Sequence, residues 1–117
     1  MITRIDAGPR LSKAVVHNKT VYTSGQVASD TSAGVTGQTQ QVLAKIDAIL
    51  AQCAIDKSHV VSASIWLADI GDYDEMNTVW DAWVAPGSAP ARATVEAHLA
   101  TPEYRVEIAV IAAIPEI

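Results

Sequence analysis

Apolar residues recur at helical spacing in two segments of the chain. The first stripe, between about Thr36 and Cys53, consists of Val42, Leu43, Ile46, Ile49, Leu50 and Cys53. The second ends before Pro86-Gly87 and consists of Met76, Val79, Trp80, Trp83 and Val84. Because residues three and four apart share a helix face, each stripe predicts a helix with one buried side. Asp72 and Glu75 have the spacing of a capping box, so we expect the second helix to begin there.

Alternation with a period of two marks the remaining apolar segments and predicts strands. These strands are expected at residues 2–6, 14–17, 20–24, 60–67, 90–96 and 104–114. The second and third are joined by a polar turn at Asn18-Lys19 and form a hairpin. Small and polar residues from 28 to 39 indicate a loop.

The last strand is apolar on both faces except at Glu107. One face carries Val106, Ile108, Val110, Ala112 and Ile114, and the other carries Glu107, Ala109, Ile111 and Ala113. Two helices cover one side of such a sheet, so we expect another subunit to cover the second side. The predicted fold is a single α+β domain over residues 1–117, with a mixed sheet of five to six strands and both helices on one face.

The composition limits the partners. Half of the residues are hydrophobic, 18% are charged, and the net charge is −5 with no basic run, which disfavours binding to nucleic acid or to an anionic membrane. No apolar run is long enough to span a bilayer, and residues 1–14 lack the apolar core of a signal peptide, so we expect a cytoplasmic protein.

Sequence motifs for phosphate, zinc, redox or serine-nucleophile chemistry are absent. Cys53 is the only cysteine and lies on the buried stripe, which indicates packing rather than a reactive thiol. The three histidines have no ligand-like spacing, so no metal site is predicted.

Arg92 is the unusual residue of the strand at 90–96. It shares one face with Thr94 and Glu96, whereas the other face carries only small or apolar side chains. A guanidinium is always charged and binds carboxylates with two parallel hydrogen bonds. Arg92 either binds a ligand, pairs with one of the chain's own acids, Glu96 or Glu107, or is an exposed charge, and the pattern alone leaves these alternatives open.

Four segments together resemble the RidA/YjgF family of reactive-intermediate deaminases, in the family's order and across nearly the whole chain. They are Val21–Val27 (VYTSGQV), Ile65–Ile70 (IWLADI) followed by Asp72-Tyr73 and Asn77, Pro90–Glu96 (PARATVE), and Val106–Ile108 (VEI). The resemblance implies a chorismate-mutase-like fold and a homotrimer with clefts between its subunits.

The resemblance also implies roles for individual residues. Arg92 matches the arginine that binds a substrate carboxylate, and Glu107 matches the acid that positions water. Ser24, Asn77 and Thr94 match other cleft positions. The implied reaction is hydrolysis of 2-imino or 2-enamino acids to 2-oxo acids and ammonia, without a metal or organic cofactor. The alternative is a trimer that binds small carboxylates without turning them over.

Arg10 departs from the family pattern, because it occupies the place after Gly8-Pro9 where active deaminases usually have tyrosine. A second cation near the cleft would favour an imine with two carboxylates, but an exposed arginine outside the site fits equally well. Substrate preference therefore stays open at this point.

Overall fold

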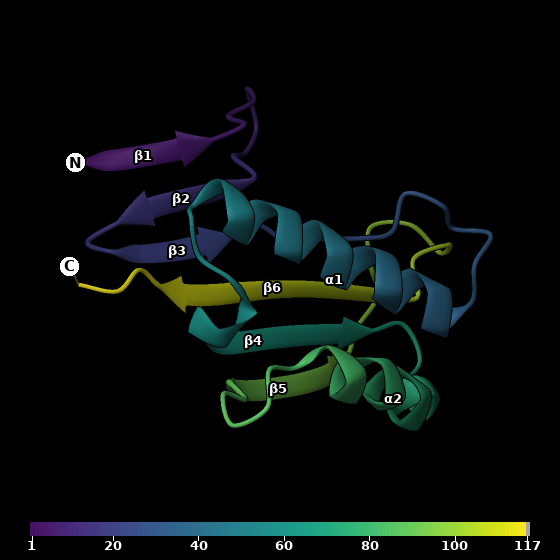
Figure 1. Cartoon of the computed structure of the whole chain (residues 1–117). Coiled ribbons are helices and arrows are strands. Elements are labelled where there is room, and N and C mark those ends of the chain that lie inside the picture. The colour runs from purple at the N-terminus through teal and green to yellow at the C-terminus, as the bar shows by residue number, and fades with distance from the viewer. Residues whose placement is uncertain (117) are drawn as a thin grey trace.

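The structure is a computed structural model that describes residues 1–116, and it contains one six-stranded sheet with two helices in front of it (Figure 1). The strands are β1 (Ile2–Ile5), β2 (Ala14–His17), β3 (Thr20–Thr23), β4 (Val60–Leu67), β5 (Ala91–Glu96) and β6 (Val106–Ala113). The helices are α1 (Val35–Gln52), α2 (Tyr73–Trp83) and two single 3-10 turns, Lys57–His59 and Ile70–Asp72. The predicted α+β class, with both helices on one face, is confirmed.

The strand order is β1-β2-β3-β6-β4-β5, and every neighbouring pair is antiparallel except β4 and β5. A parallel pair needs a crossover connection, and α2 lies within that connection. The crossover places β5 at one edge of the sheet, close to α2 (Figure 1).

The core lies between the helices and the covered face of the sheet. The residues of the two predicted helical stripes are buried or half-buried, as are the alternate positions of β4 and β6. On the opposite face, Tyr22, Val95 and Ile111 remain exposed in the single chain. In residues 1–116 no helix is both long and apolar enough to cross a membrane.

The predicted hairpin turn is confirmed at Asn18-Lys19. Both residues have positive φ, 51° and 58°, which matches a two-residue turn with the twist of its flanking strands. Several boundaries differ from the prediction by one or two residues. The helix α1 begins at Val35, so the loop is shorter than expected, and β6 begins at Val106 because the Tyr104 N–H bonds to the Thr101 carbonyl in a turn.

The predicted capping box is wrong, although Asp72 does stand at the N-cap of α2. The chain enters α2 through a 3-10 turn, which gives Asp72 φ −85° and ψ 5° instead of the extended conformation of a capping residue. The two carboxylates therefore bind elsewhere. Asp72 Oδ2 accepts a hydrogen bond from Arg105 Nη2 at 2.7 Å, and Glu75 Oε2 accepts one from Thr36 Oγ1 at 2.7 Å.

Candidate functional site

Arg92 on β5 is half-buried and contacts three side chains of α2. Its Nη1 donates to Asn77 Oδ1 at 2.7 Å, and its Nη2 donates to the Tyr73 hydroxyl at 3.1 Å. Its Cζ lies 5.6 Å from the centroid of the Tyr73 ring and 5.2 Å from that of the Trp80 ring. The guanidinium is thus fixed by two hydrogen bonds and two cation–π contacts.

Helix geometry explains why these three residues meet Arg92. Tyr73, Asn77 and Trp80 are spaced i, i+4 and i+7, so they share one face of α2. The sequence motifs placed Asn77 in the site and gave no role to Tyr73, and the helical pattern predicted Trp80 only as a core residue. Their helical spacing around Asn77 was the available signal, but it becomes informative only once β5 is known to pack beside α2.

No acid neutralises Arg92 within the described part of the chain. Its hydrogen-bonding partners are an amide and a phenol, and both are uncharged. The Glu96 carboxylate accepts the backbone N–H of Ile70 at 3.0 Å instead. The ion pairs among residues 1–116 join Lys13 to Asp6, His59 to Asp56 and Arg105 to Asp72. Of the alternatives for Arg92, a structural ion pair with Glu96 or Glu107 is therefore not found among residues 1–116.

Glu107 lies in a second cluster, against the segment that follows β3. A Cβ added at Gly25 would overlap Glu107 Oε2 and lie 2.8 Å from its Cδ, so a larger residue at this position would require the Glu107 carboxylate to move. The preceding residue, Ser24, donates its hydroxyl to the Lys13 carbonyl at 3.1 Å and accepts from Gln26 Nε2 at 3.1 Å. Within residues 1–116 the Glu107 side chain has neither a hydrogen-bond donor nor an ion-pair partner.

Arg92 and Glu107 are on opposite faces of the sheet. The central strand β4 pairs Ala63 with Arg92 on one side and Trp66 with Glu107 on the other. Successive residues of a strand alternate between faces, and Ala63 and Trp66 are three positions apart. Ala63 is buried beneath the helices, so Arg92 lies on the helix side and Glu107 on the uncovered side. One chain cannot bring these two side chains to the same ligand.

The other two predicted site residues occupy different surroundings. Thr94 shares the helix-side face with Arg92, and its Oγ1 is buried without a hydrogen-bond partner among the described residues. Arg10 lies in the exposed loop between β1 and β2. The structure therefore brings together Arg92 and Asn77, places the Ser24 segment against Glu107, and leaves Arg10 with neither group.

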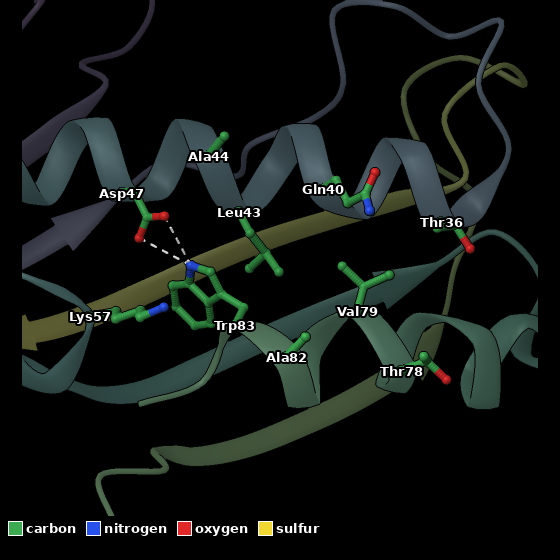
Figure 2. A pocket seen from close by; sticks show the side chains of 10 residues that line it. All are labelled: Thr36, Gln40, Leu43, Ala44, Asp47, Lys57, Thr78, Val79, Ala82 and Trp83. Carbon is green, nitrogen blue, oxygen red and sulfur yellow. Dashed lines mark hydrogen bonds between the residues drawn. The ribbon is translucent and has the colours of Figure 1, made fainter. Parts of the chain in front are cut away.

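A groove of about 480 Å³ lies between α1 and α2 (Figure 2). The Trp83 indole Nε1–H points to Asp47 and donates to its two oxygens at 3.0 and 3.1 Å, and Lys57 Nζ lies 5.5 Å from the Trp83 ring. The lining contains none of the predicted site residues, so this hollow is not the predicted cleft.

Two observations on residues 1–116 concern metal and thiol chemistry. No group of three or more His, Cys, Asp or Glu side chains converges among residues 1–116. Burial raises the pKa of the Cys53 thiol, which lowers the share of reactive thiolate. The predicted packing role of Cys53 agrees with its half-buried position against the core.

Comparisons with known proteins cover almost the whole chain. A family model described as Endoribonuclease L-PSP matches residues 1–114. A RutC family protein of Haemophilus ducreyi is 50% identical over 114 residues, which is 97% of each chain. The 2-iminobutanoate/2-iminopropanoate deaminase of Rattus norvegicus is 33% identical over 107 residues, covering 86% of this chain and 77% of the rat protein.

The comparison with solved structures finds the same family. The crystal structure of a YjgF family member from Neisseria meningitidis superposes with a TM-score of 0.95 at 50% identity, covering 100% of this chain and 98% of that one. The sheet of six strands with two helices on one face is the chorismate-mutase-like arrangement that the sequence motifs implied. On the family match and these relatives, the chain belongs to the Endoribonuclease L-PSP family, which is the RidA/YjgF family.

Proposed function

We propose that this protein hydrolyses reactive 2-imino and 2-enamino acids to 2-oxo acids and ammonia. The reaction would take place in clefts between the subunits of a homotrimer. Arg92 would bind the substrate carboxylate, and Glu107 of the partner subunit would position the attacking water.

The observation that carries the proposal is the unneutralised charge of Arg92. A half-buried cation normally has an acid beside it, because loss of hydration costs free energy that a counter-charge offsets. Here Asn77 and Tyr73 orient the guanidinium and leave its charge in place. A substrate carboxylate would supply the missing charge and accept the remaining N–H groups.

The position of Glu107 is the reason for proposing shared clefts. Glu107 and Arg92 lie on opposite faces of one sheet, so a site that uses both needs two copies of the chain. The uncovered face offers a surface for such contact, with Tyr22, Val95 and Ile111 exposed on it. Contact there would bring a second chain toward Glu107.

The chemistry requires little from the protein. Water adds to the imine carbon of R–C(=NH)–COO⁻ to give a carbinolamine, whose collapse releases ammonia and leaves R–CO–COO⁻. An enamine enters the same route after protonation of its β-carbon. Binding the carboxylate fixes the imine carbon, and a carboxylate at the position of Glu107 would orient the water and take its proton.

The remaining predicted residues have supporting roles in this proposal. Asn77 fixes the guanidinium, Ser24 leads into the Gly25 backbone that lies against Glu107, and Thr94 forms the floor beside Arg92. Arg10 is proposed at the rim, where its exposure leaves it free to meet a second carboxylate.

The relatives support the reaction class. The rat protein is named a 2-iminobutanoate/2-iminopropanoate deaminase. The family description names an endoribonuclease, but the net charge of −5 opposes binding to a polyanion, so we do not extend that activity to this chain.

The direct test generates imino acids in the reaction mixture with an amino-acid oxidase and traps them with semicarbazide. An active deaminase removes the imine before it is trapped, so the rate of semicarbazone formation should fall as the protein is added. Arg92→Ala should abolish that effect. An unchanged rate at every protein concentration would refute the proposed activity.

One alternative is a trimer that binds small carboxylates without turnover. It is favoured by the fact that Asn77 and Tyr73 orient the Arg92 guanidinium without any contribution from Glu107. Under this alternative the protein binds a 2-oxo acid in calorimetry, Arg92→Ala removes the binding, and no form of the protein changes the semicarbazone rate.

A further inference from the structure

The Tyr73 hydroxyl has an unused hydrogen beside the proposed carboxylate site. Tyr73 is the first residue of α2 and is 40% exposed, so its hydroxyl is accessible from solvent. The oxygen accepts a hydrogen bond from Arg92 Nη2 at 3.1 Å. A phenol has one donor and also accepts, so this bond leaves its O–H free. No acceptor for that O–H is found among residues 1–116.

The bond from Arg92 restricts where that hydrogen can point. Because the lone pair faces the guanidinium, the O–H is directed away from Arg92 Nη2 and cannot serve the same contact. Asn77 shows the same arrangement, since its Oδ1 accepts from Arg92 and its Nδ2 hydrogens remain available. A carboxylate that binds the free N–H groups of Arg92 would therefore have two neutral donors beside it.

We infer that Tyr73 is a positioning residue that donates its hydroxyl hydrogen to the carboxylate bound by Arg92. This inference rests on the proposed function, because it assumes that Arg92 binds that carboxylate. Tyr73 would thus contact the carboxylate of the substrate and not the reacting carbon. The interaction is made equally in the ground state and in the transition state, so it should change KM and Kd rather than kcat.

The first test removes only the oxygen. Tyr73→Phe keeps the aromatic ring against Arg92 and should keep the fold, which thermal melting checks. We expect the Kd for 2-oxobutanoate, measured by calorimetry, and the KM in the imine assay to rise roughly 10-fold, with kcat within about twofold. Tyr104→Phe, whose hydroxyl is not assigned to the site, is the matched control and should leave the three constants unchanged.

The second test asks whether the Tyr73 hydroxyl donates to the ligand or only orients Arg92. Fluorine next to the hydroxyl makes a phenol a stronger donor and a weaker acceptor. Replacing Tyr73 by 3-fluorotyrosine, at a pH that keeps the phenol protonated, should therefore tighten 2-oxobutanoate binding if the hydroxyl donates to the carboxylate. Weaker binding would mean that only the bond accepted from Arg92 matters, and that result would overturn the inference.

Arg92→Ala in the same calorimetric assay separates a failure of the Tyr73 inference from a failure of the proposed carboxylate site. If it abolishes binding and Tyr73→Phe does not weaken it, the inference about Tyr73 is wrong and the carboxylate role of Arg92 stands. If Arg92→Ala leaves binding unchanged, the carboxylate site itself is wrong, and the inference about Tyr73 is refuted with it.

Discussion

Replacing Arg92 by alanine should remove activity far more than stability. In the proposed site, the substrate loses a two-pronged charged contact in a partly desolvated cleft, which costs on the order of 3–5 kcal/mol. That free energy corresponds to a decrease in kcat/KM of roughly 10²- to 10³-fold or more. Arg92→Lys should recover little of the activity, because an ammonium ion is a point charge without the planar fork.

The stability cost is expected to be small because Arg92 has no acid partner to strand. The mutation removes hydrogen bonds to Asn77 and Tyr73 and contacts with two rings, but it also removes a half-buried charge. These opposing effects should leave a net loss of about 1–2 kcal/mol in the free energy of unfolding. For a domain of 117 residues, the Tm should fall by roughly 4 °C for each kcal/mol.

Arg105→Ala is the matched control, because Arg105 is an arginine that does pair with an acid. Its Nη2 lies 2.7 Å from Asp72 Oδ2, and the Asp72 side chain is only 17% exposed. Its removal should strand that carboxylate and lower the free energy of unfolding by about 2 kcal/mol or more. The activity per folded molecule should remain close to that of the wild type.

Imine kinetics and thermal melting on both variants decide the question. The expected result is an inactive Arg92→Ala protein that is only mildly destabilised and an active Arg105→Ala protein that is destabilised more. An Arg92→Ala protein that is destabilised but active in proportion to its folded fraction would refute the carboxylate role and make Arg92 a structural residue.

Three further predictions concern the rest of the site and the assembly. Glu107→Gln should lower kcat roughly 100-fold or more while 2-oxobutanoate binding and assembly persist. Gly25→Ala should also lower kcat, because its Cβ displaces the Glu107 carboxylate. Full activity of both variants in the imine assay would exclude Glu107 from catalysis. Light scattering should find a homotrimer. Val95→Asp on the uncovered face should dissociate it, whereas the control Ala82→Asp on the helix side should not. A folded wild-type monomer at micromolar concentration would refute the proposal of clefts shared between subunits. Cys53 should react with iodoacetamide more slowly than a free thiol at neutral pH, because its raised pKa reduces the thiolate, and urea should restore the rate; equal rates in folded and unfolded protein would contradict this.

Local patterns were sufficient for the elements of the fold. The apolar stripe of α1 predicted an 18-residue helix to within one residue at each end, because one helix face must be buried and that need fixes a 3.6-residue period. The Asn18-Lys19 turn was predicted for a similar reason, since the two short strands left only these two residues to reverse the chain. The alternation in β5 correctly grouped Arg92 with Thr94 on one face.

Local patterns did not predict the bonding partners of side chains that contact residues distant in the sequence. Asp72 has the spacing of a helix cap, but Arg105, 33 positions further along, lies close enough to bind it. The partner of Arg92 was open for the same reason, and the choice of Asn77 and Tyr73 depended on the packing of α2 beside β5.

The sequence by itself determined which residues form helices and strands, which side chains share a face within each strand, and that one face of the sheet is left without helices. Only the tertiary structure decided that Arg92 and Glu107 face opposite sides. Alternation relates residues along one strand, whereas the relation between β5 and β6 depends on their common register with β4. A shift of that register by one residue would have put both side chains on the same face, and no pattern within either strand excludes it.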